Sequence, residues 1–202
     1  MLDNQKARSM AAHVVEPVAS LLLRLRIKPN QVTVFTAFAT SIILLSTWPQ
    51  GNFLIGALLA MPFVFGDLLD GTMARLSGEN SRYGSFLDSV LDRVTDAAIF
   101  GSLIWYFANN QNSQMVATST LALSSALLIS YIRAKADAVS ADAKVGIMER
   151  SERIAVIAVG VFTFSAGITW ALEVAVAVVA VLNLVTVYQR MLSVKRSIDV
   201  DS

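Results

Sequence analysis

The sequence predicts an all-α integral membrane protein with six transmembrane helices and an N-terminal helix at the membrane surface. Of the 202 residues, 55% are hydrophobic and only 15% are charged, whereas soluble domains carry roughly 25% charged residues. The mean hydropathy is +0.60, and the apolar residues gather in six long runs. Lys and Arg residues fall between alternate runs, which is typical of membrane proteins.

The N-terminal segment, residues 1–28, is predicted to be a juxtamembrane amphipathic helix rather than a signal peptide. Its apolar part, residues 18–23, is too short for a signal peptide and is followed at once by Arg24 and Arg26. The apolar residues between Val14 and Leu25 recur at helical spacing. Such a stripe favours a helix that lies on the cytoplasmic leaflet.

Six runs with few or no charges follow, and each is a candidate transmembrane helix. Because about 20 residues cross the hydrocarbon core, the second run must extend to about residue 70 and the third must start near residues 88–92. We assign residues 29–194 to one membrane domain and residues 195–202 to a short cytoplasmic tail. A large soluble helical protein is the alternative, and the number of long uncharged runs argues against it. The runs are residues 32–48, 53–66, 97–108, 115–132, 154–170 and 174–188.

The charges predict an orientation in the membrane. All sixteen Lys and Arg residues lie before the first run, in the second and fourth connections, or after the sixth. Positive residues favour the cytoplasmic side, so both termini are expected in the cytoplasm of a multi-pass plasma-membrane protein. Trp48, Trp105 and Trp170 then fall near the opposite interface, as an aromatic belt would.

The composition also limits the kinds of site that the chain can form. It has no cysteine and one histidine, His13, which excludes a disulfide framework, a thiolate metal site and a histidine-rich zinc site. Any metal must therefore be held mainly by oxygen ligands. The net charge of +1 gives no support for a nucleic-acid partner.

Four aspartates interrupt the apolar pattern at helical spacing. Asp67 and Asp70 share one helix face, and so do Asp88 and Asp92. Helix length places all four near the cytoplasmic edge of the hydrocarbon layer, where acids mark a functional site by default. The full pattern reads Asp67-x2-Asp70-Gly71-x2-Ala74-Arg75-x8-Gly84-x3-Asp88-x3-Asp92.

These carboxylates repel one another unless cations lie among them. Hard ions such as Mg²⁺ or Mn²⁺ prefer carboxylate and water oxygens, and two such ions about 4 Å apart clamp phosphoryl groups. Gly71, Ala74 and Gly84 remove side-chain bulk where a ligand or an opposing helix approaches. Arg75 offers a fork for a phosphate oxygen. The alternative is an internal salt-bridge cluster that includes Arg75 and Arg93.

This pattern resembles the signature of the CDP-alcohol phosphotransferases, and every fixed position is present. The resemblance implies a membrane enzyme, usually a homodimer, that uses two divalent cations. It implies transfer of a phosphatidyl group from CDP-diacylglycerol to an alcohol, with release of CMP. By position it makes Asp67, Asp70 and Asp88 metal ligands, and Asp92 the general base near the second ion. The implied CDP pocket consists of Asp67, Gly71, Ala74, Arg75, Gly84 and Asp88. Because the motif offers a base but no separate nucleophile, we expect direct in-line attack.

A second group of basic residues is the best clue to the acceptor alcohol. Lys135, Arg153 and Arg190 come from the cytoplasmic ends of three predicted helices, and with Arg133 they can bind one phosphate dianion. Positive-inside topology and anchoring to anionic lipid explain some of these charges equally well.

The stretches Arg133-Ala-Lys-Ala-Asp137 and Glu149-Arg-Ser-Glu-Arg153 resemble the phosphatidylinositol phosphate synthases of actinobacteria, whose acceptor is inositol 1-phosphate. Phosphatidylglycerophosphate synthases, which accept glycerol 3-phosphate, are the close competitor. A divalent-cation transporter is the alternative from a different class, since it also needs intramembrane acids.

Overall fold

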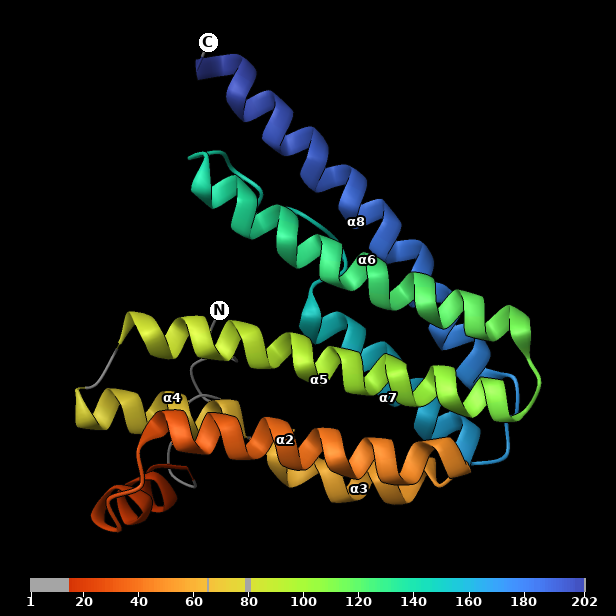
Figure 1. The fold of residues 1–202 in the computed structure, drawn as a ribbon, viewed down its shortest axis with the longest axis horizontal. Helices are drawn as coiled ribbons and strands as arrows, with labels where there is room; N and C mark the ends of the chain where they lie inside the picture. The colour runs from red at the N-terminus through yellow and green to blue at the C-terminus, as the bar shows by residue number, and fades with distance from the viewer. Residues whose placement is uncertain (1–14, 65, 79–80, 202) are drawn as a thin grey trace, which may run out of the picture. The chain divides into compact units, whose positions relative to one another are not determined.

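The computed structural model describes residues 15–64, 66–78 and 81–201, and every regular element among them is helical (Figure 1). Residues 1–14 of the predicted N-terminal segment, with His13, lie outside this part. The chain forms two compact units, one of Met1–Ile43 with Leu58–Thr95 and one of Leu44–Ala57 with Asp96–Ser202. We describe each unit by itself.

The first unit contains the described end of the N-terminal segment, where residues 15–24 are helical. Arg26 adopts a left-handed backbone with φ 62°. The amide of Ile27 donates to the carbonyl of Leu22 at 3.0 Å, which is the Schellman arrangement that ends helices. Val18 and Leu21 remain exposed, and the position of this helix at the membrane surface stays a prediction.

Two longer helices pack on this segment. Helix α2 spans Pro29–Thr47, and helix α4 spans Gly66–Ser77. The buried contact joins Ala19 of the N-terminal segment, Val32 of α2 and Met73 of α4. α4 approaches α2 closely at its start, because a Cβ added to Gly66 would lie 2.5 Å from Cγ2 of Thr36.

Helix α3 spans Phe53–Val64, and helix α5 spans Arg82–Asn109. Both continue from one unit into the other, as α2 does. α5 begins earlier than the predicted start near residues 88–92. The reason is a cap, since the amide of Gly84 donates to Oγ of Ser81 at 2.9 Å, and a serine at this position stabilises the first helical turn.

The second unit is built around three helices. They are α6 over Ser113–Ala138, α7 over Arg150–Ser165 and α8 over Ala171–Asp201. α6 and α8 pack side by side, and α7 packs on α8 (Figure 1). A short 3-10 helix, η1, covers Trp48–Gln50. The ring of Phe53 packs edge-on against the rings of Tyr106 and Phe164, with centroid separations of 4.7 and 5.3 Å.

The connection between α6 and α7, residues 139–149, is fixed to α8 by side chains. The amide of Met148 donates to Oγ1 of Thr186 at 3.0 Å, and Nε of Arg190 donates to the carbonyl of Val145 at 2.9 Å. Oγ of Ser197 accepts from the amide of Asp142 at 3.2 Å. The first residues of α7 therefore start from an anchored connection.

The helical fold class is confirmed, and the described helices follow the six predicted runs in order. Within the described part of the chain, four stretches are long and apolar enough to cross a membrane, namely Pro29–Gln50, Phe53–Ser77, Ser113–Ala138 and Ala171–Asp199. α5 carries Asp92, Arg93 and Asp96 just before its apolar run of residues 97–108, and α7 has only 16 residues, so the count of six spans stays a prediction. α8 continues as helix to Asp201 through most of the predicted tail.

Candidate functional site

The first pair of predicted metal ligands lies in the first two turns of α4. Asp70 is 9% exposed, and its Oδ2 accepts a hydrogen bond of 2.6 Å from the hydroxyl of Thr33 on α2. Hydrogen bonds to an ionised acceptor are short and strong, so the packing of α4 on α2 fixes this carboxylate. Asp67 lies three residues earlier on the same helix, and its side chain is outside the described part.

The predicted small residues differ in what surrounds them. A Cβ added to Gly71 would meet no described atom within 4 Å, whereas a Cβ at Gly84 would lie 3.0 Å from Oδ1 of Asn30. Gly71 thus leaves room for a ligand, and Gly84 lets α5 approach α2. Ala74 is half-buried, and the exposed Arg75 donates from Nη2 to the hydroxyl of Thr72 at 2.9 Å.

The second pair of acids lies on α5. Asp88 and Asp92 are one helical turn apart and half-buried. Oδ2 of Asp92 is 3.4 Å from Nη1 of Arg93, and this ion pair is one element of the salt-bridge alternative. Arg75 instead contacts a threonine, so the structure gives that alternative limited support.

The donor set suits a hard divalent cation, since it consists of carboxylate oxygens and one of them is anchored by Thr33. Among the described side chains, no three acidic or histidine groups lie close enough together to hold a metal. The side chain of Asp67 is not among them. The four-aspartate metal site therefore stays a prediction.

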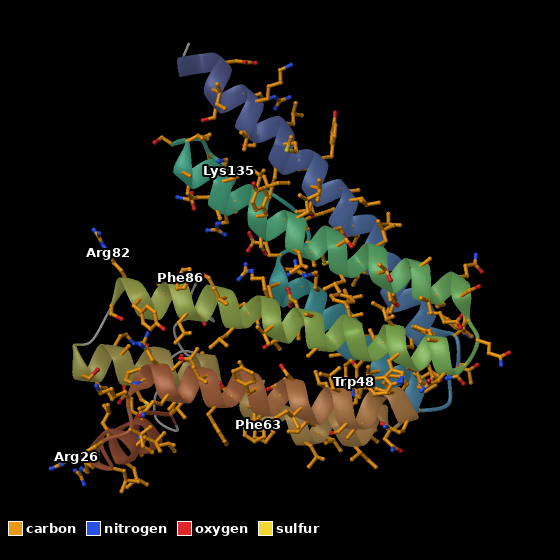
Figure 2. The ribbon with its side chains drawn as sticks, in the orientation of Figure 1. Arg26, Trp48, Phe63, Arg82, Phe86 and Lys135 are labelled. Carbon is orange, nitrogen blue, oxygen red and sulfur yellow. The ribbon has the colours of Figure 1, made fainter. Side chains whose placement is uncertain are left out.

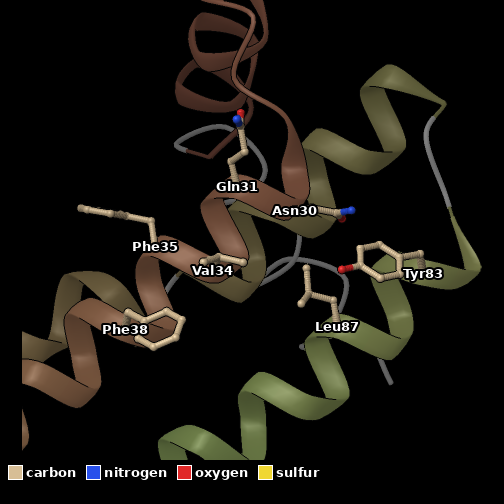
Figure 3. Close-up of a pocket in the computed structure, with 7 residues that line it drawn as sticks. All are labelled: Asn30, Gln31, Val34, Phe35, Phe38, Tyr83 and Leu87. Atoms are coloured by element: carbon tan, nitrogen blue, oxygen red, sulfur yellow. The ribbon is translucent and has the colours of Figure 1, made fainter.

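An open groove of about 570 Å³ lies in the first unit beside Gly84. Figure 3 shows Asn30 and Tyr83 at one end and Phe35 and Phe38 at the other. A mostly apolar groove with an amide and a phenol hydroxyl at one end suits an amphiphilic ligand. Its lining residues are Asn30, Gln31, Val34, Phe35, Phe38, Tyr83 and Leu87.

A buried ion pair lies in the second unit at the start of α7. Arg153 and Asp96 are each 3% exposed. Nη2 of Arg153 donates to Oδ2 of Asp96 at 2.9 Å, and Nε of Arg150 is 3.7 Å from the other carboxylate oxygen. The two oxygens of Asp96 thus face two arginines of α7.

Arg190 of α8 completes this group and is also 3% exposed. Besides the bond to Val145, its Nη1 donates to the carbonyl of Ile129 at 2.9 Å. Its Nη2 lies 3.6 Å from the carboxylate of Glu149. Arg133 and Arg153 are near enough for their charges to interact with that of Arg190. We call Arg133, Arg150, Arg153, Arg190, Asp96 and Glu149 the arginine cluster.

Of the four predicted acceptor residues, the structure buries Arg153 and Arg190 at the cluster, whereas Arg133 is exposed on α6 and reaches Arg190 only through its charge. Lys135 is exposed near the C-terminal end of α6 (Figure 2). Two residues along a helix differ by about 200° in direction, so Lys135 and Arg133 point to different sides of α6. The acceptor role of Lys135 stays a prediction.

Two residues of these sites escaped the sequence analysis. Asp96 follows Asp92 by four residues on α5, and that continued helical spacing was the available signal. Thr33 carried no such signal, because a threonine in an apolar helix usually bonds its own backbone.

Comparison with known proteins identifies close relatives. A sequence profile described as CDP-alcohol phosphatidyltransferase matches residues 26–188. The phosphatidylinositol phosphate synthase of Mycobacteroides abscessus is 37% identical over 193 residues, covering 95% of this chain and 88% of that protein. The one from Cutibacterium acnes is 40% identical over 195 residues, covering 92% and 94%.

Two crystal structures of the phosphatidylinositol phosphate synthase of Mycobacterium tuberculosis are similar to this fold. The structure with CDP-DAG bound superposes with a TM-score of 0.87 at 33% identity, covering 91% of this chain and 94% of that chain. The complex with manganese and citrate gives 0.86 at 33% identity, covering 90% and 88%.

Proposed function

Since the chain belongs to the CDP-alcohol phosphatidyltransferase family, we propose that it transfers the phosphatidyl group of CDP-diacylglycerol to inositol 1-phosphate. The products are phosphatidylinositol phosphate and CMP. The relatives at 37 to 40% identity are synthases of this lipid, and they support inositol phosphate over glycerol 3-phosphate as the acceptor.

The observation that carries the proposal is the arginine cluster, in which Arg153, Arg190 and Asp96 are buried. Charged side chains inside an apolar helix bundle are expensive, and they are retained where they bind a substrate or an ion. Arg153 and Arg190 are almost fully buried, and the cluster holds four arginines and two acids. A phosphomonoester dianion would balance that charge. A neutral alcohol would not.

The acids of α4 and α5 serve the lipid donor in this proposal. Asp67, Asp70, Asp88 and Asp92 would hold two divalent cations, Mg²⁺ or Mn²⁺, and Gly71, Ala74, Arg75 and Gly84 would complete the CDP pocket. The manganese in the structure of the relative supports a divalent ion. Bound cations would supply positive charge against the pyrophosphate and the departing CMP.

Asp92 acts as the general base. An alcohol hydroxyl is a poor nucleophile at neutral pH because its pKa lies far above 7, and a carboxylate can take its proton as the new bond forms. The acceptor oxygen then bonds to the phosphorus of the phosphatidyl group, and the bond from that phosphorus to the CMP oxygen breaks. The chain offers no separate nucleophile in the motif, so one in-line displacement is proposed, without a covalent intermediate.

The membrane arrangement follows from the charge distribution. We propose six spans formed by α2, α3 with α4, α5, α6, α7 and α8. Both termini and the active site lie on the cytoplasmic side of the plasma membrane, and the soluble acceptor reaches the site from the cytoplasm. The N-terminal segment lies on the membrane surface with Val18 and Leu21 toward lipid. We further propose that the enzyme acts as a homodimer.

The test is CMP release by the purified protein with CDP-diacylglycerol and Mg²⁺. We expect release with inositol 1-phosphate, much less with glycerol 3-phosphate, and none from the Asp92→Asn variant, which serves as the control for the site. Release with glycerol 3-phosphate alone would make the chain a phosphatidylglycerophosphate synthase. No release with either alcohol would favour the alternative that the chain is a divalent-cation transporter.

A further inference from the structure

Asp96 is a buried acid that the proposed reaction leaves without a role. It lies on α5, one turn after Asp92, and it is 3% exposed. Its contacts run to α7, where it accepts from Nη2 of Arg153 at 2.9 Å and lies 3.7 Å from Nε of Arg150. We propose that Asp96 is a positioning residue that orients the guanidinium of Arg153 toward the phosphate of the acceptor alcohol.

The start of α7 shows why the two arginines need an acid. The N-terminus of a helix carries a partial positive charge and disfavours cations. Arg150 and Arg153 both lie in the first turn of α7, and the N-cap residue, Glu149, makes no capping bond with its side chain. Asp96 supplies the opposing charge from another helix, and the short bond to Nη2 selects one orientation of the guanidinium.

The ion pair with Asp96 leaves part of the hydrogen-bonding capacity of Arg153 unused. Nε of Arg153 is buried and has no hydrogen-bond partner among the described residues. A buried donor without an acceptor is unfavourable, so Asp96 satisfies only part of the fork. A phosphate has the acceptor oxygens that would satisfy the rest.

The inference rests on the proposed function, because it assigns Arg153 to the acceptor phosphate. If Asp96 orients Arg153, the Asp96→Asn variant keeps the shape and an acceptor oxygen but loses the charge. We expect its KM for inositol 1-phosphate to rise about tenfold or more, as for a weakened charge-assisted hydrogen bond. Its kcat and its KM for CDP-diacylglycerol should stay within about twofold, since the interaction forms in the ground state and the transition state alike.

Asp137→Asn is the matched control. Asp137 is an exposed acid in the last turn of α6, and its removal changes the net charge by the same amount. We expect the acceptor KM of this variant to be unchanged. An equal rise of the acceptor KM in both variants would show that Asp96 acts only through the net charge of the protein, and would overturn the proposal.

A double-mutant cycle with Arg153→Lys separates positioning from an independent role. If Asp96 acts through the guanidinium fork, Asp96→Asn should raise the acceptor KM much less in the Arg153→Lys background than in the native one. Independent effects would instead multiply, and multiplication would overturn the proposal. Should Asp96→Asn not fold, Asp96→Glu keeps the charge and displaces the carboxylate, and a rise confined to the acceptor KM is expected in the same cycle.

The cycle also separates the failure of this inference from that of the proposed function. Turnover with inositol 1-phosphate together with multiplicative effects would leave the function standing and remove the role of Asp96. Turnover with glycerol 3-phosphate alone would change the assigned acceptor. If Asp96→Asn then had little effect on the acceptor KM in the Arg153→Lys background, the role of Asp96 would be kept. Turnover with neither alcohol would overturn both.

Discussion

Thr33 shows how one hydroxyl can decide the position of a predicted metal ligand. It comes from α2, while Asp70 comes from α4, and their bond of 2.6 Å is made 37 residues apart in the chain. Groups that hold metal ligands in place are worth about 10- to 100-fold in metal affinity or activity. The helix around Asp70 therefore supplies the ligand, and α2 supplies its orientation.

Replacement of Thr33 by valine tests this role. Thr33→Val keeps the shape of the side chain and removes the hydroxyl, so we expect the Mg²⁺ concentration for half-maximal CMP release to rise about tenfold. The control is Thr36→Val, since among the described residues the hydroxyl of Thr36 donates to two carbonyls of its own helix, at 2.9 and 3.1 Å. A similar rise in both variants would indicate general disturbance of α2 and would contradict a specific role for Thr33.

At the scale of elements, the connection of residues 139–149 sets where α7 begins. Gly146 has φ +133°, and a Cβ there would lie 2.4 Å from Cγ2 of Thr186. The same hydroxyl-bearing side chain accepts from the amide of Met148. α8 thus holds the connection by contacts that leave no space for a larger residue.

Gly146→Ala is therefore expected to destabilise the protein by roughly 2–4 kcal/mol, from backbone strain together with overpacking. The measurement is the melting temperature in detergent. Gly167→Ala is the matched control, because Gly167 has φ +102° but a Cβ there would meet no described atom within 4 Å. Gly167→Ala reports the backbone strain without the overpacking, so it should lower the stability less than Gly146→Ala does. Thr186→Ser removes Cγ2 and should restore part of the loss in the Gly146→Ala variant, and an equal loss at both glycines would show that the contact is unimportant.

The existence and order of the helices were predictable, because the length of an apolar run is a property of the sequence itself. The residues at which the helices begin and end were less predictable. α5 starts at a serine cap, and α7 ends at Ser165, where the amide of Ile168 donates to the carbonyl of Thr163 beyond the left-handed Gly167. Residues 166–170 therefore do not extend the fifth helix.

The partners of the arginines were beyond the sequence analysis. Arg153 pairs with a residue 57 positions away, and Arg190 bonds a carbonyl 61 positions away. Main-chain carbonyls carry no residue-specific signal, so only the packing of α6, α7 and α8 reveals that Arg190 also fixes backbone. The aspartate motif was different, since its members lie within 26 residues and their regular spacing could be read directly.

At the scale of the whole molecule, the membrane arrangement depends on two helices. α6 and α8 are apolar and long enough to cross, as are α2 and the stretch of α3 with α4. α5 contains Asp92, Arg93 and Asp96, and α7 is 16 residues long. If both cross, the acids on α5 and the arginines on α7 are intramembrane charges with a binding role. If neither does, these charges lie in a part of the helix bundle outside the hydrocarbon layer.

The chain has no cysteine, so single cysteines can report the side on which each connection lies. We expect cysteines at Asn110 and Thr169 to react with a membrane-impermeant maleimide in right-side-out vesicles. Those at Arg82 and Lys144 should react only after permeabilisation. All four native residues are exposed in the structure, so access to the side chain does not distinguish them. The pair Arg82 and Asn110 brackets α5, and the pair Lys144 and Thr169 brackets α7. Equal labelling within either pair would mean that the enclosed helix does not cross, and labelling of Arg82 and Lys144 alone would reverse the orientation that the positive charges predict.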